Sequence, residues 1–355
     1  MAEAKLSDRG RGVSRRATIA DLAVAAGVSV ATVDRVLNGR APVRESTARK
    51  VYEAAKAIDY HGANLIGQRI QAELPVLRLG FVLHKERQAF FRSFEAAAHA
   101  AAQEVRGFRA QALVRFSPSQ APSDYVAEME KLSGEVDAIA ALAVSHVQTA
   151  DATARFQEAG IPCIALLNDF AQGVRRAYVG LNNLKVGRIA AHMIAATVHK
   201  PGKIAVFVGG YRWHGHELRE TGFRSYFREH APQFRVLDTL VNLETRQLTY
   251  EATLDLLSRH PDLRGFYCAG GGMEGAIAAL REARAPEDVA LVVNELTPES
   301  RLALVDRYVD MVISTPLGAV CEEVFRQAIQ AIGSETPKHH EQVFLRPDLY
   351  LPESV

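Results

Sequence analysis

Apolar residues in the first 60 positions recur at the spacing of short amphipathic helices. Thr18 and Asp21 form a capping-box-like start, in which a hydroxyl is followed three residues later by a carboxylate. Helical spacing continues from Ile19 to Ala26, and Gly27 can adopt the left-handed conformation that ends a helix. The pattern predicts a first helix between Thr18 and Gly27.

Two further helices are predicted directly after this one. Ser29 can cap a helix that continues to Leu37, where the turn signal Asn38-Gly39 follows. A third amphipathic helix is expected over about 44–58. Its buried face would consist of Val51, Ala54, Ala55 and Ile58. Two short helices joined at a glycine, with a third to complete a small core, predict a helix-turn-helix, although a plain three-helix domain has the same pattern.

A helix-turn-helix places the first turn of its second helix in the major groove, where side chains reach the base edges. The exposed positions on this turn are Val30, Ala31 and Asp34, with Arg35 one turn further along. A guanidinium can bind guanine through two hydrogen bonds, whereas Val30 and Ala31 can contact only thymine methyl groups or the backbone. The helix N-terminus at Ser29 suits a phosphate.

From Arg78 onward, short apolar segments alternate with helix-like stretches. The apolar segments are 78–83, 138–142, 163–167, 203–208, 265–268, 289–293 and 311–313. This alternation predicts layers of helices on parallel sheets. Because it extends over about 270 residues, more than one sheet of ordinary size contains, we expect two lobes. Ligands bind at the carboxyl ends of the strands in such sheets.

The polar and aromatic residues that follow these segments are the candidates for a small-molecule site. Rings can stack on the C–H face of a polyhydroxylated ligand while planar polar groups bind its hydroxyls. Alternative roles stay open. Phe90 and Phe91 could belong to the hydrophobic core, Trp213 could lie either at the rim of the cleft or in the core, and Arg219 could form an ion pair on a helix surface. The candidates are His84, Phe90, Phe91, Ser145, His146, Asn168, Asp169, Trp213, Arg219, Gly272, Glu295 and Thr315.

Charge is distributed unevenly along the 355 residues. Residues 1–74 hold 12 Lys and Arg against 8 Asp and Glu, a balance of +4, and the remainder holds 30 against 33, a balance of −3. A small basic end on a mildly acidic body fits a nucleic-acid-binding module, although a solvated basic helix has the same composition. The basic leader, 1–16, is not followed by an apolar stretch and is not a secretion signal, and no segment reaches the ~18 apolar residues of a membrane span.

Cysteine, histidine and nucleophile patterns give no sign of catalysis. The scattered, odd set of Cys163, Cys268 and Cys321 is typical of reduced thiols in the cytosol. His214-Gly-His216 and His339-His340 lack the spacing and third ligand of a zinc site. GxSxG, HExxH and GxxxxGK motifs are absent from the sequence. We therefore expect a soluble cytoplasmic protein without a metal, a cofactor or a membrane partner.

One enzyme class remains as an alternative. Gly270-Gly-Gly-Met-Glu-Gly275 satisfies GxGxxG between a predicted strand and a helix, and Glu295 follows about 20 residues later, as in a dinucleotide-binding oxidoreductase. Only one further strand is predicted beyond Glu295, which is too little for a nucleotide-binding half. A glycine turn that lets this loop approach some other ligand fits equally well.

The segment 17–40, ATIADLAVAAGVSVATVDRVLNGR, strongly resembles the DNA-binding domain of the lactose/galactose-repressor family, and 43–51 and Asp59-Tyr60 keep the same register. The resemblance implies a short hinge helix after Tyr60, whose minor-groove wedge position falls on Arg69. Whether 61–73 forms this helix or a plain linker ending at Pro75 stays open. The DNA-binding residues expected from these patterns and the resemblance are Thr18, Ser29, Val30, Ala31, Thr32, Arg35, Asn38 and Arg69.

The resemblance continues to the C-terminus, where the chain is similar to that family's periplasmic-binding-protein-like (type I) effector domain. It implies that Arg219, three residues before Gly222-Phe223, binds the effector, and that Asn168, Glu295 and Thr315 lie in the effector-contacting loops. The segment 295–301 resembles a subgroup with sugar-like effectors. The loop 268–273 departs from the family, because glycine and methionine replace the usual Asn or Asp.

We therefore expect an all-α headpiece followed by a two-lobed α/β domain with parallel sheets. The expected parts are a leader (1–16), a helix-turn-helix (17–60), a hinge or linker (61–75) and an effector-binding and dimerisation domain (76–355). The implied function is a repressor of a catabolic operon that binds a pseudopalindromic double-stranded operator under control of a sugar-like effector. We expect a homodimer, since no heptad repeat follows residue 349. A transport binding protein, the third possibility, would need an export signal and no headpiece.

Overall fold

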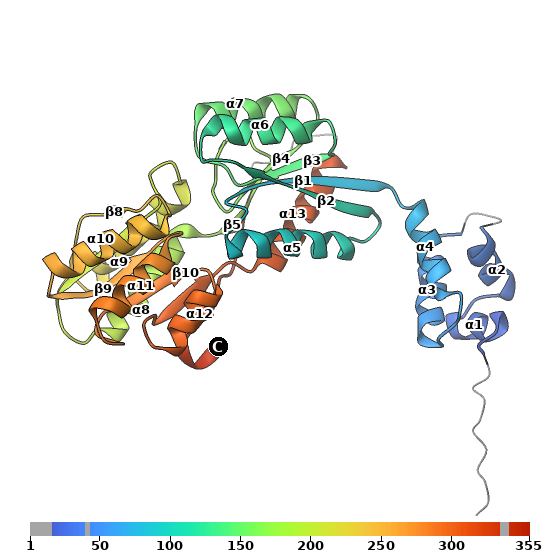
Figure 1. The fold of residues 1–355 in the computed structure, drawn as a ribbon. Helices are drawn as coiled ribbons and strands as arrows, with labels where there is room; N and C mark the ends of the chain where they lie inside the picture. Colours follow the sequence, from blue (N-terminus) through green and yellow to red (C-terminus); the bar gives the residue numbers. More distant parts are fainter. Residues whose placement is uncertain (1–15, 40–42, 334–340) are drawn as a thin grey trace, which may run out of the picture. The chain divides into compact units, whose positions relative to one another are not determined.

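A computed structural model of the protein describes residues 16–39, 43–333 and 341–355. The chain divides into two compact units (Figure 1). The small unit ends at Val76 and also takes in Arg106–Arg109, and the large unit comprises the rest of the chain from Leu77. Of the basic leader expected over 1–16, all but Arg16 lies outside the described residues.

The small unit has helical ends that follow the local sequence signals. The Thr18 hydroxyl accepts from the Asp21 amide, and the Asp21 carboxylate accepts from the Thr18 amide, which confirms the predicted capping box. Gly27 and Gly39 end their helices at φ 65° and 62°, where a residue with a Cβ is strained. The helices are α1 (Ile19–Ala26), α2 (Val30–Asn38), α3 (Glu45–Ala57) and α4 (Ala63–Glu73).

The fourth helix packs into the core of the headpiece. Ile66 is fully buried in the same cluster as Leu22, Val33 and Val51. Gly67 allows the approach, because a Cβ there would lie 2.8 Å from Cε2 of Tyr52 on α3. Residues 63–73 therefore form a helix attached to the three predicted ones, although Gly67 lowers its intrinsic helix propensity.

We expect Ile66→Ala to destabilise the headpiece by about 2–5 kcal/mol, because the side chain is fully buried and its removal leaves a cavity. Leu65→Ala is the matched control, since the neighbouring Leu65 is 49% exposed. The measurement is the first unfolding transition of the full chain in urea, followed by circular dichroism. Equal losses of stability in the two variants would contradict the placement of α4 in the core.

The large unit contains two sheets, one in each lobe. The first lobe has the strand order β12-β5-β4-β3-β1-β2, and the second has β13-β11-β10-β9-β6-β7 with β8 also paired to β6. Parallel pairing joins β1 to β3, β3 to β4, β4 to β5 and β5 to β12 in the first lobe, and it joins β6 to β7, β8 and β9, β9 to β10 and β10 to β11 in the second, whereas β13 runs antiparallel to β11. The first-lobe strands are β1 (Val76–His84), β2 (Arg109–Ser117), β3 (Ala138–Ala141), β4 (Cys163–Leu166), β5 (Ala177–Leu181) and β12 (Glu341–Leu345). The second-lobe strands are β6 (Lys203–Val208), β7 (Arg235–Val236), β8 (Leu240–Val241), β9 (Leu263–Cys268), β10 (Ala290–Asn294), β11 (Met311–Ser314) and β13 (Asp348–Tyr350).

The chain passes between the two lobes three times: after β5, after β11 and after β12. Helices cover both faces of each sheet, as expected for parallel α/β layers (Figure 1). The first-lobe helices are α5 (Ala89–Glu104), α6 (Pro122–Ser133), α7 (Val147–Glu158) and α13 (Leu317–Ile332). The second-lobe helices are α8 (Asn183–Thr197), α9 (His214–His230), α10 (Arg246–Arg259), α11 (Met273–Ala283) and α12 (Pro298–Val305), and the short 3-10 helix Pro352–Ser354 contacts α12.

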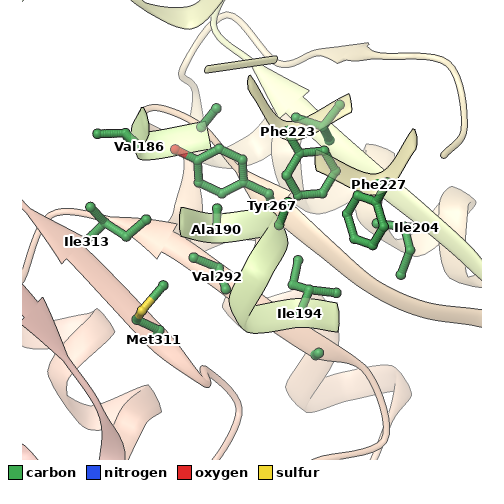
Figure 2. Close-up of a cluster of buried hydrophobic side chains, with 14 of the residues drawn as sticks. Val186, Ala190, Ile194, Ile204, Phe223, Phe227, Tyr267, Val292, Met311 and Ile313 are labelled. Carbon is green, nitrogen blue, oxygen red and sulfur yellow. The ribbon is translucent and has the colours of Figure 1, made fainter. Parts of the chain in front are cut away.

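Helices α8 and α9 pack together on one face of the second sheet (Figure 2). The Phe223 ring of α9 stacks on Tyr267 of β9 with the ring centroids 5.6 Å apart. A Cβ at Gly187 or Gly222 would collide with the backbone of the opposite helix, so the two helices can approach this closely only with glycine at these positions. The pair also brings together Asn183 of α8 and Arg219 of α9, which are joined by a hydrogen bond.

The predicted strands and the two-lobed parallel architecture are confirmed, but several strands were not predicted. Partly buried β2 contains Arg109 and Arg115, and β7, β8 and β13 are only two or three residues long, so they give no apolar segment of their own. Beyond Glu295 the structure has β11, β12 and β13, and the prediction of one further strand is wrong. Within the described ranges, no helix is long and apolar enough to cross a membrane.

Candidate functional site

The first turn of α2 presents one exposed face. Val30 is 51% exposed, and Ala31 and Arg35 are also exposed, while Val33 and Val36 on the other side of the helix belong to the headpiece core. These three exposed residues form a surface of small apolar groups beside one guanidinium. Such a surface can enter a major groove because nothing larger projects from its first turn.

The polar residues expected around this helix mainly hold its ends. The Ser29 hydroxyl accepts from the Thr32 amide and lies 2.9 Å from the Thr32 hydroxyl, and Asn38 Nδ2 donates to the Asp34 carboxylate at 2.5 Å. Thr18 caps α1 in the same way. These side chains fix the helical frame while Ser29, Asn38 and Thr18 stay exposed at its ends.

Arg69, the expected minor-groove residue, contacts the headpiece itself. Its guanidinium donates to the backbone carbonyl of Leu37 at the C-terminal end of α2. A cation at this end of a helix offsets the helix dipole and satisfies a carbonyl that has no partner within the helix. In this structure Arg69 stabilises α2 and is half-buried.

A pocket of about 900 Å³, including the part open to solvent, lies between the two lobes of the large unit. It is lined by residues that follow the strands of both sheets, as parallel α/β layers predict. Eight of the twelve predicted residues line it: His84, Phe90, Phe91, Asn168, Trp213, Arg219, Glu295 and Thr315.

The other four predicted residues have contacts elsewhere. Ser145 donates its amide to the Arg212 carbonyl, and exposed His146 caps α7. Buried Asp169 forms an ion pair with Arg175. Gly272 is the N-cap of α11, with φ 91°, and a Cβ there would collide with Thr249. Its neighbours Gly270, Gly271 and Met273 line the pocket, whereas Gly272 does not.

The aromatic residues of the pocket lie close together. The His84 ring lies 4.5 Å from the Phe91 ring and 5.2 Å from the Trp213 ring, measured between centroids, and Phe90 packs edge-on against Phe91 at 5.0 Å. Phe91 and Trp213 are only 7% and 5% exposed, and both line the pocket. Burial lowers the pKa of His84 to about 4, and its Nδ1 lies 3.0 Å from the Tyr125 hydroxyl, so a neutral imidazole faces the pocket at pH 7.

Arg219 is fixed from two sides. Its Nε donates to Oδ1 of Asn183 at 2.7 Å, and Nη1 donates to the Ala269 carbonyl at 2.6 Å. The sequence analysis missed Asn183, because it follows β5, which was not predicted. Its only signal was Asn182-Asn183 ahead of a helical segment.

Glu295 is a second ionisable residue in the pocket lining. Its carboxylate accepts from the Thr315 amide at 2.8 Å and from the Thr315 hydroxyl at 2.7 Å, while burial raises the pKa of Glu295. Planar amide, carboxyl and guanidinium groups thus surround a space beside aromatic rings. This arrangement can bind hydroxyl groups by hydrogen bonds while rings contact C–H faces.

A second buried carboxylate, that of Glu244, lies in the loop between β8 and α10. It accepts from Lys85 Nζ at 2.8 Å, from Gln120 Nε2 at 3.1 Å and from the Gly271 amide at 3.2 Å. His216 Nε2 lies 3.7 Å from the same carboxylate, and burial lowers the pKa of His216 to about 4. Sequence reasoning missed Glu244 and Gln120, because neither follows a predicted strand.

The glycine loop 270–275 does not have the geometry of a dinucleotide site. The Gly271 amide, which would face a pyrophosphate, donates to Glu244, so the anion position is already occupied by a carboxylate. A Cβ at Gly275 would collide with the Arg246 carbonyl, and one at Gly270 would lie 2.5 Å from Cε1 of His216. The glycines are explained by these close contacts within the protein. The acidic residue of the fingerprint, Glu295, binds Thr315.

In the part of the chain that the structure describes, no three His, Cys, Asp or Glu side chains are grouped to hold a metal ion. His339 and His340 lie outside that part. The three cysteines are buried and unpaired, and burial raises the pKa of each thiol to about 12. They are thiols at pH 7 and poor nucleophiles.

Comparison with known proteins gives two family matches. The model for bacterial regulatory proteins of the lacI family matches residues 18–62, and the model for the periplasmic binding protein domain matches residues 79–336. An HTH-type transcriptional regulator encoded in the aml 5′ region of Streptomyces limosus is 28% identical over 331 residues, 88% of this chain and 89% of that protein. The regulator MalR of Streptomyces coelicolor is 25% identical over 93% of this chain and 94% of its own length.

Solved structures match the large unit. A periplasmic solute binding protein from Actinobacillus succinogenes with bound D-allose superposes with a TM-score of 0.71 at 18% identity, covering 78% of this chain and 98% of that one. At this identity the match establishes the two-lobed fold of the large unit.

Proposed function

Because this chain belongs to the lacI family of bacterial regulatory proteins, with a periplasmic binding protein domain behind its helix-turn-helix, we propose that it represses a catabolic operon under the control of a small polyhydroxylated effector. The observation that carries this proposal is a cleft pocket of clustered aromatic rings and planar polar groups on the same polypeptide as a helix-turn-helix with an exposed first turn. The protein is then a cytoplasmic DNA-binding regulator, and neither a catalyst nor a carrier of a cofactor.

The effector is proposed to be a sugar or a polyol. The pocket combines Phe90, Phe91 and Trp213 with Asn168 and Arg219, which suits a ring with a C–H face and several hydroxyls. The structurally similar binding protein from Actinobacillus succinogenes holds D-allose, which supports a ligand of this size and chemistry.

The DNA site is proposed to be a pseudopalindrome bound by a homodimer. One headpiece contacts too few base pairs for specificity, so two must be presented at a fixed half-site spacing. Val30, Ala31 and Arg35 are the proposed base-reading residues, and Thr18, Ser29, Thr32 and Asn38 position the helix on phosphates. We propose that, when DNA is bound, the Arg69 side chain leaves the Leu37 carbonyl and inserts into the minor groove.

Effector control follows from differential affinity. An effector that binds more tightly to the closed pocket shifts the geometry of the dimer, and operator affinity changes by the same coupling free energy, typically ~1–3 kcal/mol. The sign of this coupling free energy decides whether the effector releases the protein from its operator or recruits it there.

The experiment is a selection of DNA ligands from a random duplex library with the full-length protein, followed by binding titrations with sugars, polyols and purines. We expect selected sites with two inverted half-sites about 10–10.5 base pairs apart or at a multiple of this spacing. We also expect that a sugar or polyol, and no purine, shifts the titration midpoint about 5–150-fold. Selected sites without inverted repeats would contradict the dimer, and a purine response would contradict the effector class.

A further inference from the structure

Glu244 places a negative charge in the wall of the effector pocket. Its carboxylate is the meeting point of donors from both lobes: Lys85 and Gln120 belong to the first lobe, and Gly271 belongs to the second. Glu244, Gly271 and His216 also line the pocket. A carboxylate of the protein itself therefore occupies the position in which these donors would otherwise bind an anionic group of a ligand.

The surrounding backbone is built to hold this side chain. Leu243 and Glu244 have φ angles of 49° and 54°, a left-handed conformation that costs free energy in residues other than glycine. A Cβ at Gly209 would lie 2.5 Å from Cγ of Glu244, and a Cβ at Gly271 would lie 2.9 Å from its Cβ. Strain in one loop and glycines in two others are thus all explained by the position of Glu244.

The charge of Glu244 is fixed by its partners. Burial alone would raise the pKa of Glu244, but the Lys85 ammonium, joined at acid pH by the protonated His216 and His84, outweighs burial and holds this pKa well below its usual value. At neutral pH the carboxylate is ionised and neutralises Lys85. His84 and His216 contribute no positive charge there, because burial lowers the pKa of each to about 4.

The remaining charges of the pocket also disfavour an anion. Among the described residues that line it, the cation is Arg219, whose Nε and Nη1 already donate to Asn183 and Ala269, and the acidic residues are Glu244, Glu274 and Glu295. A ligand carboxylate would therefore either lie beside these groups or displace Glu244 from Lys85. Displacement would leave a buried charge without its partner, which is costly.

We propose that Glu244 is a specificity-determining residue that makes the pocket accept an uncharged polyhydroxylated ligand and reject the corresponding sugar acid. This inference rests on the proposed effector class and narrows it to uncharged sugars and polyols. Glu244 acts through its charge: it neutralises Lys85 and places a carboxylate in the pocket wall, which disfavours a second carboxylate from the ligand.

The test is the substitution Glu244→Gln in the full-length protein. The amide keeps the size of the side chain and one acceptor oxygen but removes the negative charge, so the positive charge of Lys85 is no longer neutralised and favours a ligand carboxylate in the pocket. Glucose with gluconate and galactose with galactonate are the probe pairs, measured by isothermal titration calorimetry. We expect the wild type to prefer the neutral member of a pair by at least about tenfold, and Glu244→Gln to reduce or reverse that preference by about tenfold.

Two further variants keep the test decisive. Glu287→Gln is the matched control, because the Glu287 side chain is 64% exposed and is not among the described residues that line the pocket, and we expect it to leave the preference unchanged. Lys85→Met removes the cation and leaves Glu244 uncompensated, so the preference for the neutral member should increase. This variant tests the inference from the opposite side if Glu244→Gln fails to fold.

The outcomes separate this inference from the proposed function. A wild type that binds the acid more tightly overturns the inference, and so does a folded Glu244→Gln variant that binds the neutral sugar with an unchanged preference. A wild type that binds no member of any pair, nor any other sugar or polyol, overturns the proposed effector class and the inference with it.

Discussion

Arg35→Ala is expected to abolish specific DNA binding while leaving the effector pocket intact. A bidentate contact between arginine and guanine contributes ~1–3 kcal/mol of discrimination, and a dimer contains two copies. The affinity for the selected operator should therefore fall about 30-fold to more than 10,000-fold. Fluorescence anisotropy at one fixed salt concentration measures the effect, with the selected operator and a scrambled duplex compared side by side.

The pattern across the two duplexes carries the conclusion. Arg35→Ala should bring the operator affinity close to that of the scrambled duplex, whereas loss of a phosphate contact weakens both equally. Lys50→Ala is the control, because Lys50 is an exposed cation on α3, outside the recognition helix. If the alanine variant at Arg35 still discriminates operator from scrambled duplex, Arg35 does not read bases.

Arg219→Met should remove the effector response and leave operator binding unchanged. Arg219 is 9% exposed, and its guanidinium is held at the pocket by Asn183 and the Ala269 carbonyl, so a ligand hydroxyl can bind it without further ordering. A hydrogen bond to a charged group contributes ~1.5–3 kcal/mol, which predicts an effector affinity about 10- to 150-fold weaker. Calorimetry with the effector and anisotropy with the operator measure the two functions separately.

Lost packing must be distinguished from lost binding. Methionine keeps the apolar stem of Arg219, and the melting temperature of the variant reports any loss of folding. Arg228→Met, on the same helix, is the control, because the Arg228 side chain is 77% exposed. An unchanged effector response in a folded Arg219→Met variant would place the ligand elsewhere in the protein.

The headpiece helices could be predicted from the sequence because their signals are local. Thr18, Asp21 and Gly27 define the ends of a helix within ten residues, and the resulting caps follow the sequence pattern directly. The strand segments of the two sheets are equally local, since buried parallel strands consist of nearly continuous apolar residues. Because ligands bind at the carboxyl ends of such strands, most of the predicted pocket residues line the pocket.

What could not be predicted depends on partners that are distant in the sequence. Asp169 follows a strand, yet it forms an ion pair with Arg175. Glu244 follows no recognisable strand, yet Lys85 and Gln120, more than 100 positions earlier, bring it into the pocket wall. The register predicts Arg69 as a minor-groove residue, and its contact with the Leu37 carbonyl of α2 has no signal in the sequence. Such pairings are set by the tertiary fold and leave no periodic pattern.

The three passages of the chain between the lobes have a consequence for biosynthesis. The first sheet begins with β1 but acquires its edge strand, β12, only after almost all of the second lobe has been translated. On the ribosome, β5 therefore lacks its neighbour, and α13 is not yet available to cover the face. The emerging first lobe exposes an unpaired strand and apolar surface for most of its synthesis, and it should depend on chaperones until the second lobe is complete.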